Sequence, residues 1–162
     1  MRHLLKIIAG LFAAVGLMAS CSDTCNDNRN ALPLAGFYVN DSTGVAASVQ
    51  IDSIQVIGIG QGVDSVLSSA SESKTELYLP FRIDSDRTQY VFQLHRNQQQ
   101  INDTVTFDYN RVLRFASAEC GVSYVFHIQN ISSQGVLIDS VVCPNGFIDN
   151  SNIENLRIYI HD

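Results

Sequence analysis

The sequence lacks a hydrophobic run long enough to cross a membrane as a helix. The apolar run at residues 7–18 has twelve residues, whereas a spanning helix needs roughly 20. Positively charged side chains lie before it at residues 2–6, and the small residues Ala19 and Ser20 follow it. This order is that of a secretory signal peptide. We therefore predict that residues 1–20 form a signal peptide and are removed.

Cysteine is scarce, and one of the four cysteines directly follows the predicted signal. Residues 17–20 precede Cys21 as in the bacterial lipobox, with Met18 in a place more often held by Leu, Val or Ile. We predict that Cys21 is lipidated and that residues 21–31, which are rich in Asp, Asn and Ser, form a flexible tether. Each buried acyl methylene contributes about 0.8 kcal/mol, so stable anchoring takes more than one chain. The alternative is a secreted protein whose Cys21 joins a disulfide.

Basic residues are also few, with ten Lys and Arg against sixteen Asp and Glu. The formal net charge is −6, and loss of Arg2 and Lys6 with the signal would bring it to −8. An acidic chain without a Lys/Arg cluster argues against nucleic acid as a partner and against electrostatic docking on a membrane. The acyl chains on Cys21 are therefore the predicted membrane contact. Residues 32–162 are long enough for one domain with a hydrophobic core.

Helical periodicity is missing after residue 31, where apolar residues recur at every second position. Each such run has one apolar and one polar face, as in an antiparallel sheet that is packed on one side. The clearest runs lie at residues 76–83, 89–95, 104–109, 122–128 and 153–160. Turn signals lie at residues 58–60, 84–86, 97–100, 110, 132–133, 135 and 144–146. We predict an all-β protein, an antiparallel β-sandwich of about eight or nine strands, immunoglobulin-like or similar.

Known catalytic motifs are absent from the sequence, which has no G-x-S-x-G elbow, glycine-rich phosphate loop or H-E-x-x-H pair. The sequence therefore names no catalytic residue and no cofactor. Asp84-Ser85-Asp86 lacks the following Gly and the distal Glu of a calcium loop, so we interpret it as a hairpin turn. His95, His127 and His161 occupy polar positions of their strands, which predicts exposed side chains rather than metal ligands.

Five segments share the pattern Asp, hydroxyl residue, then an apolar residue or Thr. The pattern looks like the O-glycosylation signal of Bacteroidota envelope proteins, which predicts modification of at least one hydroxyl. The candidate acceptors are Ser42, Ser53, Ser65, Thr104 and Ser140. The alternative is structural, because Asp and Ser end turns and β-branched residues begin strands.

Four short motifs together resemble a known family. They lie at residues 34–38 (LAGFY), 118–121 (AECG), 138–141 (IDSV) and 154–158 (ENLRI). Over nearly the whole mature chain, the sequence is similar to a family of small Bacteroidota lipoproteins that is catalogued only as a domain of unknown function. The resemblance implies lipidation and a Bacteroidota source, and it supplies no activity, substrate or catalytic residue.

Lipidation of Cys21 would leave three cysteines, enough for one bridge and one free thiol in an oxidising periplasm. In the resembled family, a cysteine shortly after the lipidated one and a cysteine before a glycine are usual. The resemblance therefore implies a bridge between Cys25 and Cys120. The alternative joins Cys120 to Cys143, because these two flank a hairpin centred near Ser132.

These features predict a lipid-anchored protein of the cell envelope that binds a protein or glycan partner and is not an enzyme. One alternative is a hydrolase of envelope glycans that uses carboxylates such as Asp84, Asp86 or Glu119, two of which would have to lie about 5 to 9.5 Å apart in a pocket. Another is a structural accessory of an outer-membrane assembly. Ser22 rather than Asp follows the lipidated cysteine, which favours the outer membrane.

Overall fold

The computed structural model describes residues 31–162 with the exception of residues 42, 70–71, 97–98, 118–120, 150, 152 and 162. Within this part of the chain the fold consists of strands and connecting segments, without a helix. The prediction of an all-β protein is confirmed. It follows that the described ranges hold no apolar helix of membrane-spanning length.

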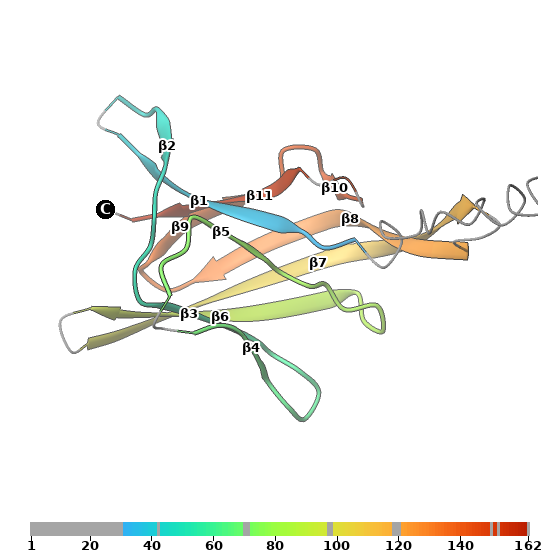
Figure 1. The fold of residues 1–162 in the computed structure, drawn as a ribbon, viewed down its shortest axis with the longest axis horizontal. Coiled ribbons are helices and arrows are strands. Elements are labelled where there is room, and N and C mark those ends of the chain that lie inside the picture. Colours follow the sequence, from blue (N-terminus) through green and yellow to red (C-terminus); the bar gives the residue numbers. More distant parts are fainter. Residues whose placement is uncertain are drawn as a thin grey trace, which may run out of the picture.

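One sheet has five strands, in the order β2-β1-β11-β9, with β5 also paired to β1. The strands are β1 (Leu34–Asn40), β2 (Ala46–Ser48), β5 (Glu76–Tyr78), β9 (Ile138–Val142) and β11 (Glu154–Ile160). β1 and β11 run parallel, with Phe37 opposite Ile158, and the other pairs of this sheet are antiparallel. The first and last strands therefore lie side by side in the middle of this sheet (Figure 1).

The other sheet has six strands, in the order β10-β8-β7-β6-β3-β4, and all of its pairs are antiparallel. The strands are β3 (Ile54–Gly58), β4 (Ser65–Ser68), β6 (Arg87–Arg96), β7 (Gln99–Ser117), β8 (Gly121–Gln134) and β10 (Phe147–Ile148). The two long strands β7 and β8 pair from Thr104 opposite Gln134 to Ser117 opposite Gly121. Antiparallel pairing, as predicted, thus holds for every strand pair except β1 with β11.

The two sheets face each other and enclose one hydrophobic core, which confirms the predicted β-sandwich (Figure 1). Phe37 comes from the first sheet, and Phe92 and Phe107 come from the second; all three are completely buried. Phe81 enters the same core from the connection between β5 and β6, and its ring stacks on that of Tyr109 with centroids 4.7 Å apart. Each such side chain contributes about 1.5–3 kcal/mol when it is buried.

Several predicted boundaries are wrong. Asn110 lies inside β7. The register of β7 with β8 shifts at a bulge between Asp108 and Tyr109, and the pairing of the two strands continues beyond it. Residues 132–133 belong to β8, and the chain reverses at Gly135. The described residues form eleven strands rather than eight or nine, because β2, β4, β5 and β10 have only two to four residues. Segments this short show no clear alternation.

The run predicted at residues 76–83 is a strand only at Glu76–Tyr78. The chain then crosses to the other sheet, and Leu79 and Phe81 stay buried along the way, which explains why the alternation continues. Asp84-Ser85-Asp86 lies in this crossing. It is not the predicted hairpin turn, because β5 and β6 belong to different sheets.

Candidate functional site

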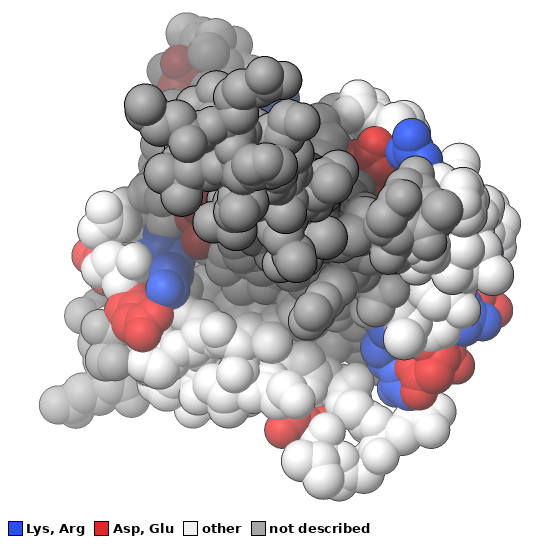
Figure 2. Space-filling model, turned by 45° about the vertical axis from the view of Figure 1, so that its right-hand side comes forward, with Lys and Arg blue, Asp and Glu red and all other residues white. Residues whose placement is uncertain are grey.

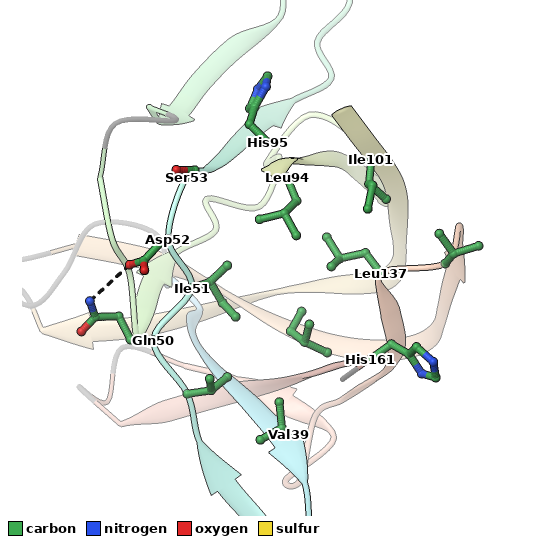
Figure 3. Close-up of a pocket in the computed structure, with 13 residues that line it drawn as sticks. Val39, Gln50, Ile51, Asp52, Ser53, Leu94, His95, Ile101, Leu137 and His161 are labelled. Carbon is green, nitrogen blue, oxygen red and sulfur yellow. Dashed lines mark hydrogen bonds between the residues drawn. The ribbon is translucent and has the colours of Figure 1, made fainter. Parts of the chain in front are cut away.

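The candidate site is a cavity at the end of the sandwich where the β6–β7 hairpin meets the β2–β3 and β8–β9 connections. Its volume is about 550 Å³. The floor is apolar and formed by both sheets and their connections: Val39, Val49, Ile51, Leu94, Ile101, Leu137 and Ile160. In Figure 3, Ile51, Leu94 and Leu137 point toward the same space from three different segments. Cavities of this size and character commonly hold apolar ligands or side chains.

The rim of the cavity is polar. Gln50, Asp52, Ser53, His95 and His161 surround the opening. Gln50 donates a hydrogen bond of 3.4 Å to the Asp52 carboxylate (Figure 3). A hydrogen bond from Ser73, together with that from Gln50, lowers the pKa of Asp52. The rim therefore carries a negative charge at neutral pH beside an apolar floor.

The three histidines of the described chain are exposed, as predicted. In Figure 3, His95 and His161 point away from the cavity floor. The ring of His161 lies 3.1 Å from the carboxylate of Asp139, and the ring of His127 lies 6.2 Å from that of Phe147. Over the residues that the structure describes, no cluster of three or more His, Cys, Asp or Glu side chains is arranged to hold a metal ion.

A buried carboxylate positions one wall of the cavity. Asp103 of β7 is completely buried, and its Oδ1 accepts a hydrogen bond from the amide of Val136 at 3.0 Å. Its Oδ2 accepts from the amides of Leu137 and Ile138 at 2.8 and 2.7 Å. A Cβ at Gly135 would overlap this carboxylate, and the φ of Gly135 is +145°, so glycine is required there. Asp103 therefore fixes the β8–β9 connection that carries Leu137 into the cavity.

In the sequence, Asp103 is part of a possible glycosylation pattern, and its buried role was not predicted. The signal was present in the alternation, because Asp103 has the same phase as Ile101, Val105 and Phe107. A carboxylate in the apolar phase of a strand predicts a buried charge, and buried charges need hydrogen-bond partners. The partners themselves lie about 33 residues away and could not be identified from spacing.

The carboxylates proposed for a hydrolase are engaged in ion pairs. Arg82 donates to both oxygens of Asp84, at 3.0 and 2.8 Å, and this interaction lowers the pKa of Asp84. Asp86 accepts from Arg111 at 2.7 Å. Asp84 lines a second cavity, of about 530 Å³, together with Arg82 but without Asp86. A glycosidase general acid needs a raised pKa, which is the opposite of what Arg82 produces. Glu119 lies outside the described residues.

Opposite charges are also neighbours elsewhere on the surface. On the face drawn in Figure 2, the blue Lys and Arg side chains lie next to red Asp and Glu side chains. Arg87, for example, donates to Asp108 at 2.6 Å, and this bond lowers the pKa of Asp108. The basic side chains seen on this face thus have acidic neighbours.

The candidate glycosylation acceptors differ in exposure. Ser65 and Ser140 are exposed, Ser53 and Thr104 are half-buried, and Ser42 lies outside the described residues. The aspartates of three of these patterns act structurally: Asp41 accepts from the amides of Thr43 and Val45, Asp64 accepts from the amide of Gly60, and Asp103 is buried. The turn interpretation therefore accounts for these three aspartates, while glycosylation stays a prediction.

Of the cysteines, only Cys143 lies within the described residues. It follows β9, is half-buried, and forms no disulfide in the part of the chain that the structure describes. Its Sγ lies 3.9 Å from the carbonyl oxygen of Phe147, and burial raises the pKa of the thiol. Cys21, Cys25 and Cys120 lie outside the described residues, so lipidation and both possible bridges stay predictions.

The first and last of the four motifs meet in the parallel pair of β1 and β11. The hydroxyl of Tyr38 donates to Glu154 at 2.6 Å, and Arg157 donates to the other oxygen of Glu154 at 2.9 Å. The buried side chain of Asn155 accepts from the amide of Leu34 at 3.3 Å. These motif residues therefore join the two ends of the domain and have a structural role.

A family model with the description "Family of unknown function (DUF6452)" matches residues 48–160. The matched region contains the cavity residues from Val49 to Ile160 but not strand β1. No curated protein and no solved structure matches the chain.

Proposed function

Because the chain belongs to a family of unknown function (DUF6452), its role has to be inferred from its own residues, and we propose that it is a lipid-anchored, non-enzymatic binding module of the cell envelope. The observation that carries the binding role is the cavity of about 550 Å³ with its apolar floor. Transfer of an apolar group from water to such a floor is favourable. The partner that fits this cavity best is an envelope protein with an exposed apolar segment, in preference to a glycan.

The proposed anchor is Cys21, and its support is the signal-like segment before it and the Asp, Asn and Ser residues after it. In cells that are fed labelled palmitate, the unaltered protein should carry the label and sediment with the outer membrane. The Cys21→Ser variant should lose the label and appear in the soluble fraction. An unlabelled, soluble protein before any substitution would contradict anchoring. Protease treatment of intact cells would then show whether the domain faces the outside.

The cavity is tested by cross-linking in cells. A photoreactive benzoylphenylalanine in place of His95, on the rim, should form an adduct with a specific protein. The same group in place of Val63, which is 81% exposed and does not line the cavity, serves as the matched control. Leu94→Arg should remove the rim adduct, because a charge on the apolar floor disfavours burial of an apolar partner.

The cavity proposal would be wrong if both positions gave the same adducts, or if Leu94→Arg left the adduct unchanged in a protein that still unfolds cooperatively. Val63→Arg should leave the rim adduct unchanged. The two alternatives make different predictions. A glycan hydrolase would lose activity on substitution of Asp84 or Asp86, and a structural accessory would copurify in fixed ratio with an integral outer-membrane protein.

A further inference from the structure

The β7–β8 hairpin extends beyond the sandwich. In Figure 1 both strands continue past the ends of β1 and β11. Arg111 lies near the point where the opposing segment ends, and it donates to Asp86 of the β5–β6 connection at 2.7 Å. Beyond this ion pair the ladder continues, with Leu113 opposite Tyr124 and Phe115 opposite Val122.

The inner face of this terminal part is apolar and exposed. Residues that alternate along a strand share a face, so Leu113 and Phe115 face the same way as the buried Tyr109. Residues opposite each other in an antiparallel ladder also share a face, which adds Val122. Leu113, Phe115 and Val122 are nevertheless 59%, 68% and 59% exposed. Val112, on the other face, is 45% exposed.

We define the hairpin tip as these four residues, Val112, Leu113, Phe115 and Val122. Apolar side chains on both faces form a wedge, and contiguous exposed apolar surface of this kind marks a site of interaction with a protein or a membrane. Arg114 lies between Leu113 and Phe115 and is exposed, and its positive charge acts on the carboxylate of Asp149. A guanidinium has five N–H donors, so it can bind a further anionic oxygen.

The course of the chain indicates which partner covers the tip. The amide of Ala31, the first described residue, donates to the carbonyl of Tyr124 at 3.3 Å, so the preceding segment begins beside the hairpin tip. Ten residues separate Ala31 from Cys21. Ten extended residues span at most about 33–36 Å. Acyl chains on Cys21 would therefore keep the hairpin tip close to the bilayer surface.

From these observations we propose that the hairpin tip is a second membrane contact, which inserts its apolar side chains into the bilayer interface while Arg114 binds lipid phosphates. This inference rests on the proposed acylation of Cys21. Apolar side chains in the headgroup region gain free energy by leaving water, and the covalent anchor strengthens this weak affinity because it holds the hairpin tip at the bilayer surface. The lipid surface is thus the partner, in preference to a second copy of the chain.

The proposal also fixes the orientation of the domain. Ile101, on the cavity floor, and Phe115, in the tip, lie on the same strand, and fourteen residues separate them. At about 3.3 Å per residue they are roughly 45 Å apart. With the tip in the interface, the cavity therefore opens away from the anchoring membrane.

The absence of tryptophan from the sequence gives a direct test. Phe115→Trp places the one tryptophan of the variant in the hairpin tip, and Val136→Trp, at a site that is 75% exposed at the cavity end, is the matched control. Both acylated proteins are bound to phosphatidylcholine vesicles with brominated acyl chains. We expect quenching of about twofold or more at position 115, because the indole lies among the lipids, and none at position 136.

The outcomes separate the two proposals. Vesicle-bound protein without quenching at position 115, or with equal quenching at both positions, overturns the membrane contact and leaves the anchor intact. Protein that carries no acyl chains and does not float with vesicles overturns the anchor and, with it, this inference. A soluble dimer of Cys21→Ser protein that Leu113→Asp dissociates would assign the tip to a second copy and would also overturn the proposal.

A second measurement uses the chain without acylation. In the Cys21→Ser background, Leu113→Ser combined with Phe115→Ser should lower the partition coefficient onto the same vesicles by about tenfold, because two large apolar side chains are lost. Val63→Ser, which removes an apolar side chain that is 81% exposed elsewhere on the surface, should change the partition coefficient little. Equal partitioning of all three proteins would contradict the proposal. Because all these residues are exposed, cooperative unfolding should persist in each variant.

Discussion

Two backbone amides of the β8–β9 connection, together with the amide of Ile138 at the start of β9, donate to the single carboxylate of Asp103. Hydrogen bonds to a charged acceptor contribute about 1.5–3 kcal/mol each, and a buried amide that loses its acceptor carries a similar cost. The connection has no regular ladder of its own at this point, so the carboxylate takes the place of a neighbouring strand. One side chain of β7 thus fixes the start of β9 in the other sheet at the cavity end.

We predict that Asp103→Asn lowers the free energy of unfolding by about 2–4 kcal/mol, because the amide NH₂ group cannot accept a hydrogen bond. Urea unfolding followed by circular dichroism measures the change. Asp139→Asn is the matched control, since Asp139 is exposed and its ion pair with His161 contributes little. Equal effects of the two substitutions would show that the Asp103 bonds do not hold the connection.

Two buried tyrosines fix the crossing between β5 and β6. The hydroxyl of Tyr90 donates to the carbonyl of Pro80 at 2.5 Å, and that of Tyr109 donates to the carbonyl of Arg82 at 2.9 Å. Burial raises the pKa of both hydroxyls above the ordinary value near 10. The crossing is therefore held by groups that are neutral across the physiological pH range.

This raised pKa predicts loss of stability in alkali. Above about pH 10 the tyrosines of the unfolded chain ionise first, so the unfolded state binds fewer protons than the folded state and the free energy of unfolding falls as pH rises. The stability that results from the raised pKa of these two tyrosines is fully present below about pH 10. Tyr90→Phe should reduce the slope of unfolding free energy against pH between about 10 and 12. An unchanged slope in urea titrations would show that Tyr90 is not responsible.

At the scale of elements, the long strands follow from their own sequences and the short ones do not. β6, β7 and β8 have ten, nineteen and fourteen residues, and the alternating runs predicted at residues 89–95, 104–109 and 122–128 lie within them. β2, β5 and β10 have two or three residues, and what makes them strands is a partner elsewhere in the chain. Asn110 was predicted as a turn because of its residue type, but pairing with His127 keeps it in β7.

Strand β1 is the element on which the first sheet depends. It pairs with β2, β5 and β11, and it buries Ala35 and Phe37 completely. The family match begins at residue 48 and so omits it. The matched region alone therefore lacks the central strand of one of its two sheets.

We predict that a chain limited to residues 48–160 does not unfold cooperatively, whereas a chain of residues 31–162 does. Without β1, strands β5 and β11 lose their partner and the core loses Phe37. The free energy lost in this way exceeds the usual free energy of unfolding of a small domain. Urea unfolding of the two chains tests this. A sigmoidal transition in the shorter chain would show that β1 is dispensable.

In the whole molecule, the path of the described chain favours one of the two possible disulfides. The bond from the Ala31 amide to Tyr124 brings the preceding chain beside β8. Cys25 is six residues before Ala31, and Cys120 is four residues before Tyr124. Both cysteines are thus only a few residues from the contact between Ala31 and Tyr124. A bridge between Cys25 and Cys120 is compatible with this contact.

The alternative bridge fits less well. The thiol of Cys143 lies beside Phe147, which pairs with His127 of β8. Gly121, the neighbour of Cys120, is six residues further along that strand, or roughly 20 Å. The Cα atoms of a disulfide lie within about 7 Å of each other. We therefore favour Cys25 with Cys120.

We predict that peptide mapping of the non-reduced, acylated protein recovers a peptide that joins Cys25 to Cys120. Cys143 should be the one alkylated thiol, and it should react slowly, because burial raises its pKa and thiolate is the reactive form. Reduced protein provides the control in which all three react. A peptide that joins Cys120 to Cys143 would overturn this pairing.

Alternation along the chain was enough to predict the period of the long strands, the exposure of the histidines and the sandwich class, because it is a local property that reports which side chains share a face. Tertiary structure alone decided what covers each face. Phe107 and Phe115 have the same phase in β7, yet one is completely buried and the other is 68% exposed. The opposing sheet ends between them. For the same reason the partners of Asp103 and the cavity floor, which join segments far apart in the chain, could not be predicted from spacing.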